Sequence, residues 1–320
     1  MRPNVGTHNP YWVGKKVVVT GGTGFLGWHL TQQLRERGAN VTVLALAPSL
    51  AHPIYRFGDI TKIWGDIRDK DTVRRALAEC DLVFHTAGVV GAWGHILDSI
   101  WSVHVDGTRN VLEQARSGLR IIHTSSLTTV GASPRGRVLD ENATFLLQNS
   151  KLHYVAAKRA AEMLALEAAA AGADLVITNP GYLVGPDDYE HSIMARLCLR
   201  YWKGRIPLVP PGGLNLADVR DVAHGHLLAA EHGQSGRRYI LGGENHHFGS
   251  FFRLLAHVAA SRPRAYLPIP WVGLLFVAGL AELRARFSGR EPYPSLGHVR
   301  LNSYCWFGNS ARAESELGYT

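Results

Sequence analysis

Tyr154 and Lys158 are the two side chains of this chain whose types and spacing most directly allow chemistry. The segment 151–171 predicts a helix, so residues four apart lie on one face, one turn from each other. A tyrosine hydroxyl has a reference pKa of ~10, and a neighbouring ammonium group stabilises its phenolate. The pair could therefore donate or accept a proton near neutral pH.

Two serines, Ser125 and Ser126, follow a predicted buried strand over 119–124. Ligands of parallel sheets bind at the carboxyl ends of strands, so these hydroxyls should face such a ligand. A serine that holds a carbonyl oxygen beside a tyrosine and a nicotinamide would allow carbonyl reduction or alcohol oxidation. A tyrosine and a lysine four apart are common in helices, so this chemistry depends on a cofactor site.

A glycine-rich turn near the N-terminus predicts that cofactor site. It joins a strand over 16–20 to a helix that starts at residue 25, and its glycines have the spacing G-x-x-G-x-x-G. Missing side chains let the backbone turn tightly and approach a pyrophosphate, and the helix N-terminus offers unpaired N–H groups to phosphates. The alternative is a turn without a ligand. The predicted dinucleotide-binding residues are Gly21, Gly22, Thr23, Gly24, Phe25, Leu26 and Gly27.

Strands and helices alternate along the chain, which predicts a doubly wound parallel sheet of the Rossmann type. The second strand ends in Leu46, Ala47 and Pro48. An acidic residue there would favour NAD and a basic residue NADP, so the sequence does not show which of the two is used. Further strands are predicted over 60–64, 82–85 and 174–178, and further helices over 69–79 and 96–116.

Two other segments could also contact the cofactor. Asp66, with Ile67 beside it, could accept a hydrogen bond from the adenine amino group, or it could cap the helix that follows. Thr86, Ala87 and Gly88 follow the fourth strand and are small enough for a cofactor to lie against their backbone.

Composition restricts the partners of this chain. The sequence has 34 Lys and Arg against 26 Asp and Glu, for a net charge of +8, but the basic residues are scattered rather than grouped in a nucleic-acid arm. Three distant cysteines without a C-x-x-C pair indicate a reducing compartment, and we expect a cytoplasmic protein. His246 and His247 form no metal motif, so no metal is expected.

Two segments bear on membranes and targeting. Residues 1–14 are polar and lack the apolar core of a signal peptide. The longest apolar run, 267–281, contains Pro268 and Pro270 and is shorter than the ~20 residues that cross a bilayer. We expect a core helix there, with contact to a membrane surface as the alternative.

The motifs together resemble the extended short-chain dehydrogenase/reductase family over nearly the whole chain. The resemblance implies that Ser126 is the catalytic serine, with Ser125 as the fallback, and that Tyr154 and Lys158 are catalytic. Lys158 would also bind the nicotinamide ribose, and Pro180 would lie against the nicotinamide. The motifs are T-G-G-T-G-F-L-G, G-D-I-R-D, H-T-A-G, T-S-S-L-T-T-V-G, Y-V-A-A-K and N-P-G-Y-L-V-G-P.

The sequence also departs from the family pattern. His104 replaces the usual asparagine, where it could relay protons or be a buried structural histidine, and Ala157 replaces a frequent serine. Leu214 falls where nucleotide-sugar epimerases have an arginine, which counts against a diphosphate-bearing substrate. Family members usually continue beyond Thr320, so we expect a shortened C-terminus, and they commonly form homodimers through the helices that hold His104 and Tyr154.

The pattern most resembles the dihydroflavonol 4-reductase and 3β-hydroxysteroid dehydrogenase branch, and R-R-Y-I-L-G-G-E-N resembles hopanoid-associated sugar epimerases. We therefore expect an oxidoreductase for a largely apolar ketone or secondary alcohol. An NAD-dependent sugar epimerase or dehydratase is the alternative, and a dinucleotide-sensing protein without catalysis is a third reading. An apolar substrate wall is predicted from Val89, Val90, Trp93, Tyr182, Leu183, Val184 and 207–211.

Two lobes are expected. The dinucleotide-binding domain would comprise 12–180 and 214–241, and the substrate-binding lobe would comprise 181–213 and 242–320.

Overall fold

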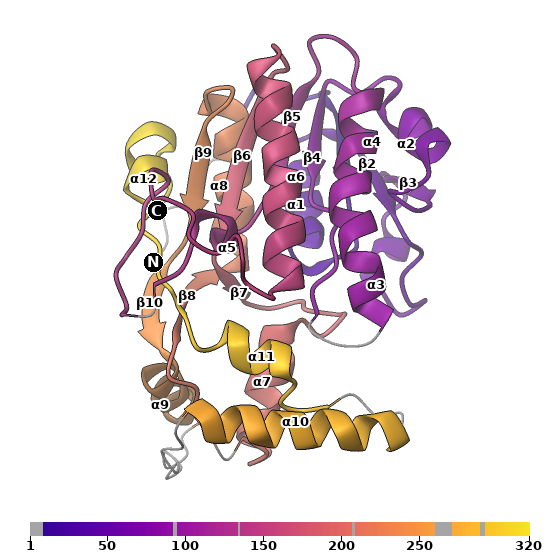
Figure 1. The fold of residues 1–320 in the computed structure, drawn as a ribbon. Helices are drawn as coiled ribbons and strands as arrows, with labels where there is room; N and C mark the ends of the chain where they lie inside the picture. The colour runs from indigo at the N-terminus through magenta and orange to yellow at the C-terminus, as the bar shows by residue number, and fades with distance from the viewer. Residues whose placement is uncertain (1–8, 92–94, 134, 207–208, 260–270, 289–291) are drawn as a thin grey trace.

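The chain folds into two sheets with helices packed around them (Figure 1). The larger sheet has seven strands, all parallel, and the smaller sheet has four. The predicted doubly wound sheet with a smaller C-terminal lobe is confirmed. The computed structural model describes every residue except 1–8, 92–94, 134, 207–208, 260–270 and 289–291.

The larger sheet has the strand order β3-β2-β1-β4-β5-β6-β9. Val17 and Val19 of β1 point into one hydrophobic core and Val18 points into the other, because side chains alternate along a strand. Strands covered on both faces are continuous apolar runs for this reason. The strands are β1 (Lys16–Thr20), β2 (Asn40–Ala45), β3 (Thr61–Trp64), β4 (Leu82–His85), β5 (Arg120–Thr124), β6 (Leu175–Pro180) and β9 (Arg238–Leu241).

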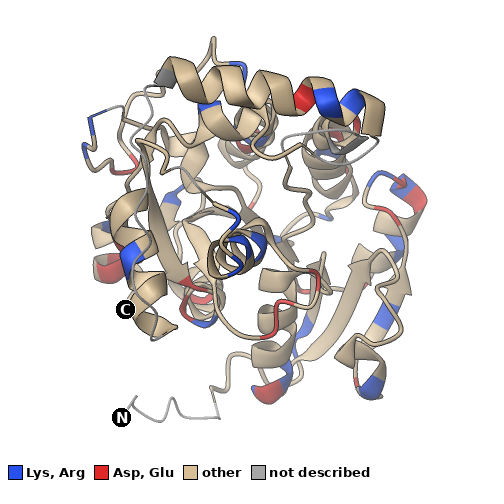
Figure 2. Ribbon diagram, turned by 90° about the horizontal axis from the view of Figure 1, so that it is seen from below, with Lys and Arg blue, Asp and Glu red and all other residues tan. Residues whose placement is uncertain are grey.

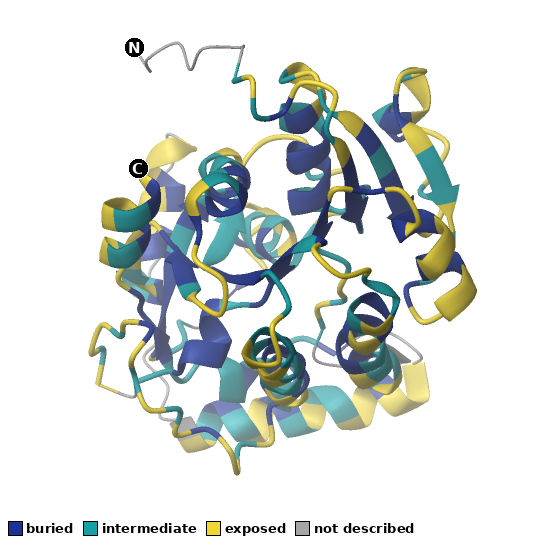
Figure 3. Cartoon of the chain, turned by 90° about the horizontal axis from the view of Figure 1, so that it is seen from above, coloured by how far each residue is buried: buried dark blue, intermediate teal, exposed yellow. Residues whose placement is uncertain are grey.

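Helices cover both faces of this sheet, which makes three layers with buried strands in the middle (Figure 3). One face is covered by α1 (Phe25–Glu36), α8 (Val219–His232) and α12 (Ala311–Leu317). The opposite face is covered by α2 (Lys70–Leu77), α4 (Gly107–Gln114) and α6 (His153–Ala170). A short 3₁₀-helix, η1 (Pro53–Arg56), follows β2.

The helix predicted over 96–116 is not continuous. It consists of α3 (His95–Trp101), a π-helical turn η2 (Ser102–Asp106) and α4, which ends at Gln114. A π-helical turn keeps the apolar spacing of a helix nearly unchanged, so the sequence pattern does not reveal it, and such turns are frequent at functional sites. His104 lies in this turn and is buried.

The smaller sheet and its helices form the rest of the molecule. The sheet contains β7 (Tyr182–Val184), β8 (Gly213–Asp218), β10 (Glu244–His247) and β11 (Cys305–Trp306), and its helices are α7 (Ile193–Trp202), α9 (Phe248–Val258), α10 (Trp271–Ser288) and α11 (Leu296–Leu301). β8 pairs within this sheet although it lies in the range predicted for the dinucleotide-binding domain, whereas β9 pairs within the larger sheet. The division into two lobes stays a prediction.

Part of the apolar run 267–281 forms the start of α10. The expectation of a core helix is confirmed for one side of the described part, where Leu274 and Ala278 are buried, and is wrong for the other side, where Val272 and Phe276 are exposed. The periodicity of an apolar run shows that a helix forms, but it does not show whether both of its sides are covered.

Four neighbouring strands of the larger sheet end at one edge. β1, β4, β5 and β6 are adjacent in the sheet, and their last residues are Thr20, His85, Thr124 and Pro180. Pro180 was predicted to follow the sixth strand and is instead its last residue. The segments after these strand ends carry most of the predicted site residues.

Candidate active site

At two positions of the glycine turn after β1, neighbouring backbone atoms leave no room for a side chain. Gly21 has a φ of +69°, and a Cβ atom there would lie 2.8 Å from Cα of Ala87. A Cβ atom on Gly27 would lie 2.2 Å from the carbonyl oxygen of Gly21. The missing side chains therefore allow α1 to pack on the turn and the turn to pack on the segment after β4.

The N-terminus of α1 is built for an anion. Its N-cap residue is Gly24, which has no side chain that could bond the first N–H groups of the helix. The first turn, 25–28, is F-L-G-W and contains no carboxylate that would repel a phosphate. Free N–H groups and the positive end of the helix dipole thus meet at the turn, and these residues fit the diphosphate of a dinucleotide.

The segment after β4 is held against β1 by Thr20. The hydroxyl of Thr86 donates to the carbonyl oxygen of Thr20 at 2.6 Å. The N–H of Ala87 donates to the hydroxyl oxygen of Thr20 at 3.2 Å. Gly88, which follows, is exposed. The backbone of this segment therefore lies beside the glycine turn, where the sequence predicts a cofactor contact.

Asp66 is already paired within the chain. Its carboxylate accepts hydrogen bonds from the guanidinium of Arg68 at 2.6 and 3.0 Å, and this contact lowers the pKa of Asp66. The alternative role of Asp66 as a helix cap is wrong, because Asp69 is the N-cap residue of α2. Ile67 is buried beside it. The contact of Asp66 with adenine stays a prediction.

The hydroxyl that the structure brings to Tyr154 belongs to Ser126. Burial raises the pKa of Tyr154 to about 12, and a hydrogen bond with Ser126 acts in the opposite direction, as expected for a donor to the phenol oxygen. The Oγ atom of Ser126 accepts from the N–H and the hydroxyl of Thr128 at 3.2 and 2.9 Å, which leaves its own proton to donate. The fallback, Ser125, instead shares a buried hydrogen bond with Thr129.

Lys158 lies one turn further along α6 and is buried. Its Nζ atom donates to the carbonyl oxygen of Thr124, the last residue of β5, at 2.9 Å. Burial lowers the pKa of Lys158 to about 8, and the carboxylate of Glu162 acts against this decrease. Lys158 is therefore still mostly protonated at neutral pH and places a positive charge behind Tyr154.

His104 lies between the cofactor segment and Tyr154. The centres of the His104 and Tyr154 rings are 5.7 Å apart with the rings nearly perpendicular, and a Cβ atom on Gly88 would lie 2.6 Å from Cε1 of His104. Nε2 of His104 lies 2.8 Å from the carbonyl oxygen of Val89, so it must carry the proton and donate. Burial and, secondly, Lys158 lower the pKa of His104 to about 3, so the ring is neutral.

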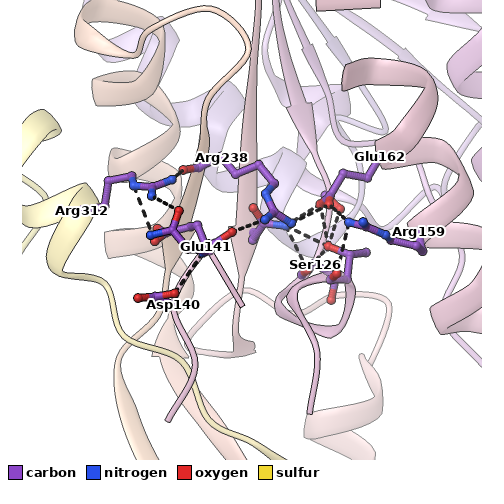
Figure 4. Close-up of polar contacts among 11 residues, drawn as sticks. Ser126, Asp140, Glu141, Arg159, Glu162, Arg238 and Arg312 are labelled. Atoms are coloured by element: carbon purple, nitrogen blue, oxygen red, sulfur yellow. Dashed lines mark hydrogen bonds and ion pairs between the residues drawn. The ribbon is translucent and has the colours of Figure 1, made fainter. Parts of the chain in front are cut away.

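A buried carboxylate, Glu162, organises the polar side chains behind Ser126 (Figure 4). Its Oε2 atom accepts from Thr129 Oγ1 at 2.5 Å and from Asn179 Nδ2 at 2.7 Å. Its Oε1 atom accepts from Arg159 at 2.8 Å and from Arg238 at 3.2 Å. Asn179 also donates to the carbonyl oxygen of Ser126 at 3.1 Å, which connects the carboxylate to the backbone of the candidate serine.

The network extends to the C-terminal helix. Arg238 donates to the carbonyl oxygen of Glu141, and Arg312 lies 3.7 Å from the carboxylate of Glu141 (Figure 4). The sequence prediction missed these residues. A signal existed for Glu162, a charged residue one turn after Lys158 on the same face of a helix.

The predicted substrate residues are separated by the structure. Tyr182 packs in one cluster with Tyr154, and its hydroxyl oxygen is buried without a hydrogen-bond partner among the described residues. Leu183 points to the other face of β7 and packs on the core that contains Phe25. The carbonyl oxygen of Val89 accepts the His104 hydrogen bond. Trp93 and residues 207–208 lie outside the described residues.

No metal centre is found in the part of the chain that the structure describes, since no three His, Cys, Asp or Glu side chains are grouped to hold an ion. The side chains gathered at the strand ends are a hydroxyl, a phenol and an ammonium group, those of Ser126, Tyr154 and Lys158.

Comparison with known proteins shows the family of this chain. The family model of the NAD-dependent epimerase/dehydratase family matches residues 17–242. The chain belongs to this family. It is 34% identical over 310 residues to a Synechocystis sp. protein provisionally named dihydroflavonol 4-reductase, covering 94% of this chain and 88% of that protein. It is 32% identical over 305 residues to sterol demethylase protein B of Methylococcus capsulatus, covering 94% and 92%.

Solved structures agree on the fold. A dTDP-glucose 4,6-dehydratase of Streptomyces venezuelae, solved as a double mutant with NAD bound, superposes with a TM-score of 0.73 at 20% identity and covers 95% of this chain and 91% of that one. Members of the NAD-dependent epimerase/dehydratase family use a nicotinamide dinucleotide, for which the glycine turn has the required shape. The predicted family and branch are confirmed, and the chain is an NAD(P)-dependent enzyme that acts between CH–OH and C=O groups.

Proposed function

We propose that this enzyme interconverts a ketone and a secondary alcohol on a largely apolar substrate, as dihydroflavonol reductases and hydroxysteroid dehydrogenases do, with Tyr154 as the acid and base. The arrangement of Ser126, Tyr154 and Lys158 at the carboxyl edge of the sheet is the observation that carries this proposal, since Lys158 donates to the carbonyl oxygen of Thr124, two residues before Ser126, at 2.9 Å. It joins a proton donor to a second hydroxyl that can hold the same substrate oxygen.

The described side chains support a division of roles. The bound dinucleotide supplies the hydride for reduction and accepts it for oxidation. Ser126 orients the carbonyl oxygen, and Tyr154, protonated at neutral pH because its pKa is about 12, donates its proton to that oxygen. The charge of Lys158 then stabilises the phenolate that remains, and Lys158 would also hold the nicotinamide ribose. Pro180, buried at the end of β6, would lie against the nicotinamide ring.

Two features support an apolar substrate. Leu214, which stands where nucleotide-sugar epimerases have an arginine, is fully buried in a hydrophobic core and offers no donor to a diphosphate. The names of both relatives also refer to polycyclic, mostly apolar molecules, a dihydroflavonol and a sterol.

The buried hydroxyl of Tyr182 would gain a partner from a substrate oxygen, since an unpaired buried donor costs about 1–3 kcal/mol.

Turnover assays with two classes of substrate test the proposal. The purified chain is mixed with NADH or NADPH and either an apolar ketone, such as a dihydroflavonol or a 3-ketosteroid, or a nucleotide sugar. We expect loss of the reduced cofactor only with the apolar ketone. Isomerisation of the sugar without net loss of reduced cofactor would support the epimerase instead, and tight cofactor binding without any turnover would support a dinucleotide sensor.

We also propose that the enzyme works in the cytoplasm as a homodimer, formed by the adjacent helices α4 and α6 with α3 beside them. The exposed side chains of Trp101 on α3 and Met163 on α6 support a contact there. Light scattering of wild type and Met163→Glu tests it, and a monomeric wild-type chain would disprove the dimer.

A further inference from the structure

Helix α10 carries a row of large apolar side chains on its outer side. Val272, Phe276, Leu280, Leu283 and Phe287 have exposed fractions of 74, 69, 52, 52 and 86%. An α-helix turns by ~100° per residue, so residues three or four apart share one side of it. We call this set the α10 stripe.

The opposite side of α10 is covered. Leu274 and Ala278 are buried and pack with Val299 of α11. The stripe is therefore not the core-facing side of the helix. It extends over about 22 Å, at ~1.5 Å per residue. Exposed apolar residues are normal when they are single, but a continuous row of this length marks a surface that contacts something.

The surroundings of the stripe are basic. Arg284 and Arg286 are exposed, and the helical repeat places them on the two borders of the stripe. Segments 193–206, 248–259, 271–288 and 292–304 together contain eight Lys and Arg residues, six of them exposed, and one acidic residue, Glu282 (Figure 2). The carboxylate of Glu282 accepts the N–H of Leu296 at 2.7 Å. The positive charge of these four segments is thus almost uncompensated within them.

We propose that the α10 stripe docks on a membrane surface rich in anionic lipids, with α10 lying in the plane of the interface. Helices that bind in this way carry apolar side chains bordered by arginine. The apolar side chains enter the acyl boundary, and the arginines contact lipid phosphates. None of the helices in the described part of the chain could span a bilayer. A second copy fits less well, since a twofold axis would bring two basic faces together.

Docking would bring the substrate-binding lobe to the place where an apolar substrate dissolves. This consequence rests on the proposed function, whereas the docking surface rests only on the stripe and its charge. Vesicle binding is measured without turnover. A failure of the docking proposal can therefore be told from a failure of the proposed function.

Flotation of the full chain with vesicles tests the proposal. We expect it to float with equal mixtures of phosphatidylcholine and phosphatidylglycerol, less at high salt, and not with phosphatidylcholine alone. Phe276→Gln combined with Phe287→Gln should bind at least about tenfold more weakly. Arg284→Gln combined with Arg286→Gln should bind about tenfold more weakly and leaves the stripe intact, so it decides the question if the first variant loses its fold.

Val13→Gln is the matched control, because Val13 is an exposed apolar residue (58%) on the larger domain, and it should float as the wild type does. Absence of wild-type binding to the anionic vesicles, or equal binding by wild type and the arginine variant, would overturn the proposal. A third result would also overturn the proposal. If light scattering without lipid shows that the wild type is a dimer and the phenylalanine variant a monomer, the stripe is a contact between two copies.

Discussion

The glycine turn and the active face of α6 lie at the same edge of the sheet, but they are stabilised in different ways. The turn depends on side chains that are missing, since a Cβ atom on Gly27 would lie 2.2 Å from a carbonyl oxygen. The face of α6 depends on side chains that are present, with Glu162 accepting four hydrogen bonds behind Ser126. Rigid backbone cannot move aside for a new methyl group, whereas a polar network can lose one partner and retain the others.

This difference predicts two kinds of failure. Substitutions in the turn should remove cofactor binding almost completely. Substitutions around α6 should leave cofactor binding intact and change the rate, the pH dependence or the stability by graded amounts.

Gly27→Ala should have the largest effect. The added methyl group would collide with the turn, and we expect cofactor binding at least about a hundredfold weaker. Titration of the protein with NADH and NADPH, followed by fluorescence, measures this. Gly58→Ala is the control, because a Cβ atom there meets nothing within 4 Å. Unchanged affinity in Gly27→Ala would mean that the turn does not hold the cofactor.

Tyr154→Phe should separate the two regions most clearly. Removing the phenol proton should lower kcat by roughly 10³, within the range of general acid catalysis, and leave cofactor affinity unchanged. Tyr55→Phe, which changes a half-exposed tyrosine that donates to Pro48, should behave as the wild type. Substantial activity in Tyr154→Phe would remove Tyr154 from the mechanism.

The same contrast explains how far the sequence predicts the structure. Features set by neighbours along the chain are predictable, such as β1, the glycine turn, and Tyr154 with Lys158 on one helical face. The resemblance of the motifs to a known family also selects Ser126 over Ser125, and this choice stays a prediction.

Features set by distant segments are not predictable in this way. Glu162 gathers Thr129, Asn179 and Arg238, which come from three other parts of the chain, and a pattern of residue types does not reveal such pairings. The π-helical turn around His104 and the uncovered side of α10 are missed for the related reason that helical periodicity does not report what packs against a helix.

Glu162→Gln should have a smaller effect than Tyr154→Phe. Loss of the charge leaves Arg159 and Arg238 without their buried partner, which should lower the free energy of unfolding by about 3 kcal/mol. Slight displacement of Ser126 should lower kcat roughly tenfold without weakening cofactor binding. Glu162 raises the pKa of Lys158, so this pKa should fall further below its usual value, and the alkaline limb of the pH profile should move to lower pH.

The control for Glu162→Gln is Glu167→Gln, which removes an exposed carboxylate from the same helix. It should leave the unfolding free energy, kcat and pH profile unchanged. If Glu162→Gln shifts stability but neither kcat nor the pH profile, the network is only structural and does not position Ser126.

Three buried histidines between the two regions should affect the pH dependence of stability rather than the reaction. Nδ1 of His85 lies 2.9 Å from Thr20 Oγ1, and His123 and His104 lie on the side of α6. Burial, and secondly Lys158, lowers the pKa of His85 to about 3, and burial also lowers the pKa values of His104 and His123. Below pH 6.5 the unfolded chain therefore binds more protons than the folded chain.

Stability contributed by these neutral rings should be complete above about pH 6.5 and should be lost as the pH falls towards about 3, by up to ~1.4 kcal/mol per pH unit for each ring. Denaturant unfolding at pH 7 and pH 5 measures the slope. His104→Asn removes one titrating ring and should reduce the slope by one proton, whereas His257→Asn on the exposed side of α9 should not. An unchanged slope in His104→Asn would mean that His104 does not remain buried and neutral between the cofactor turn and Tyr154.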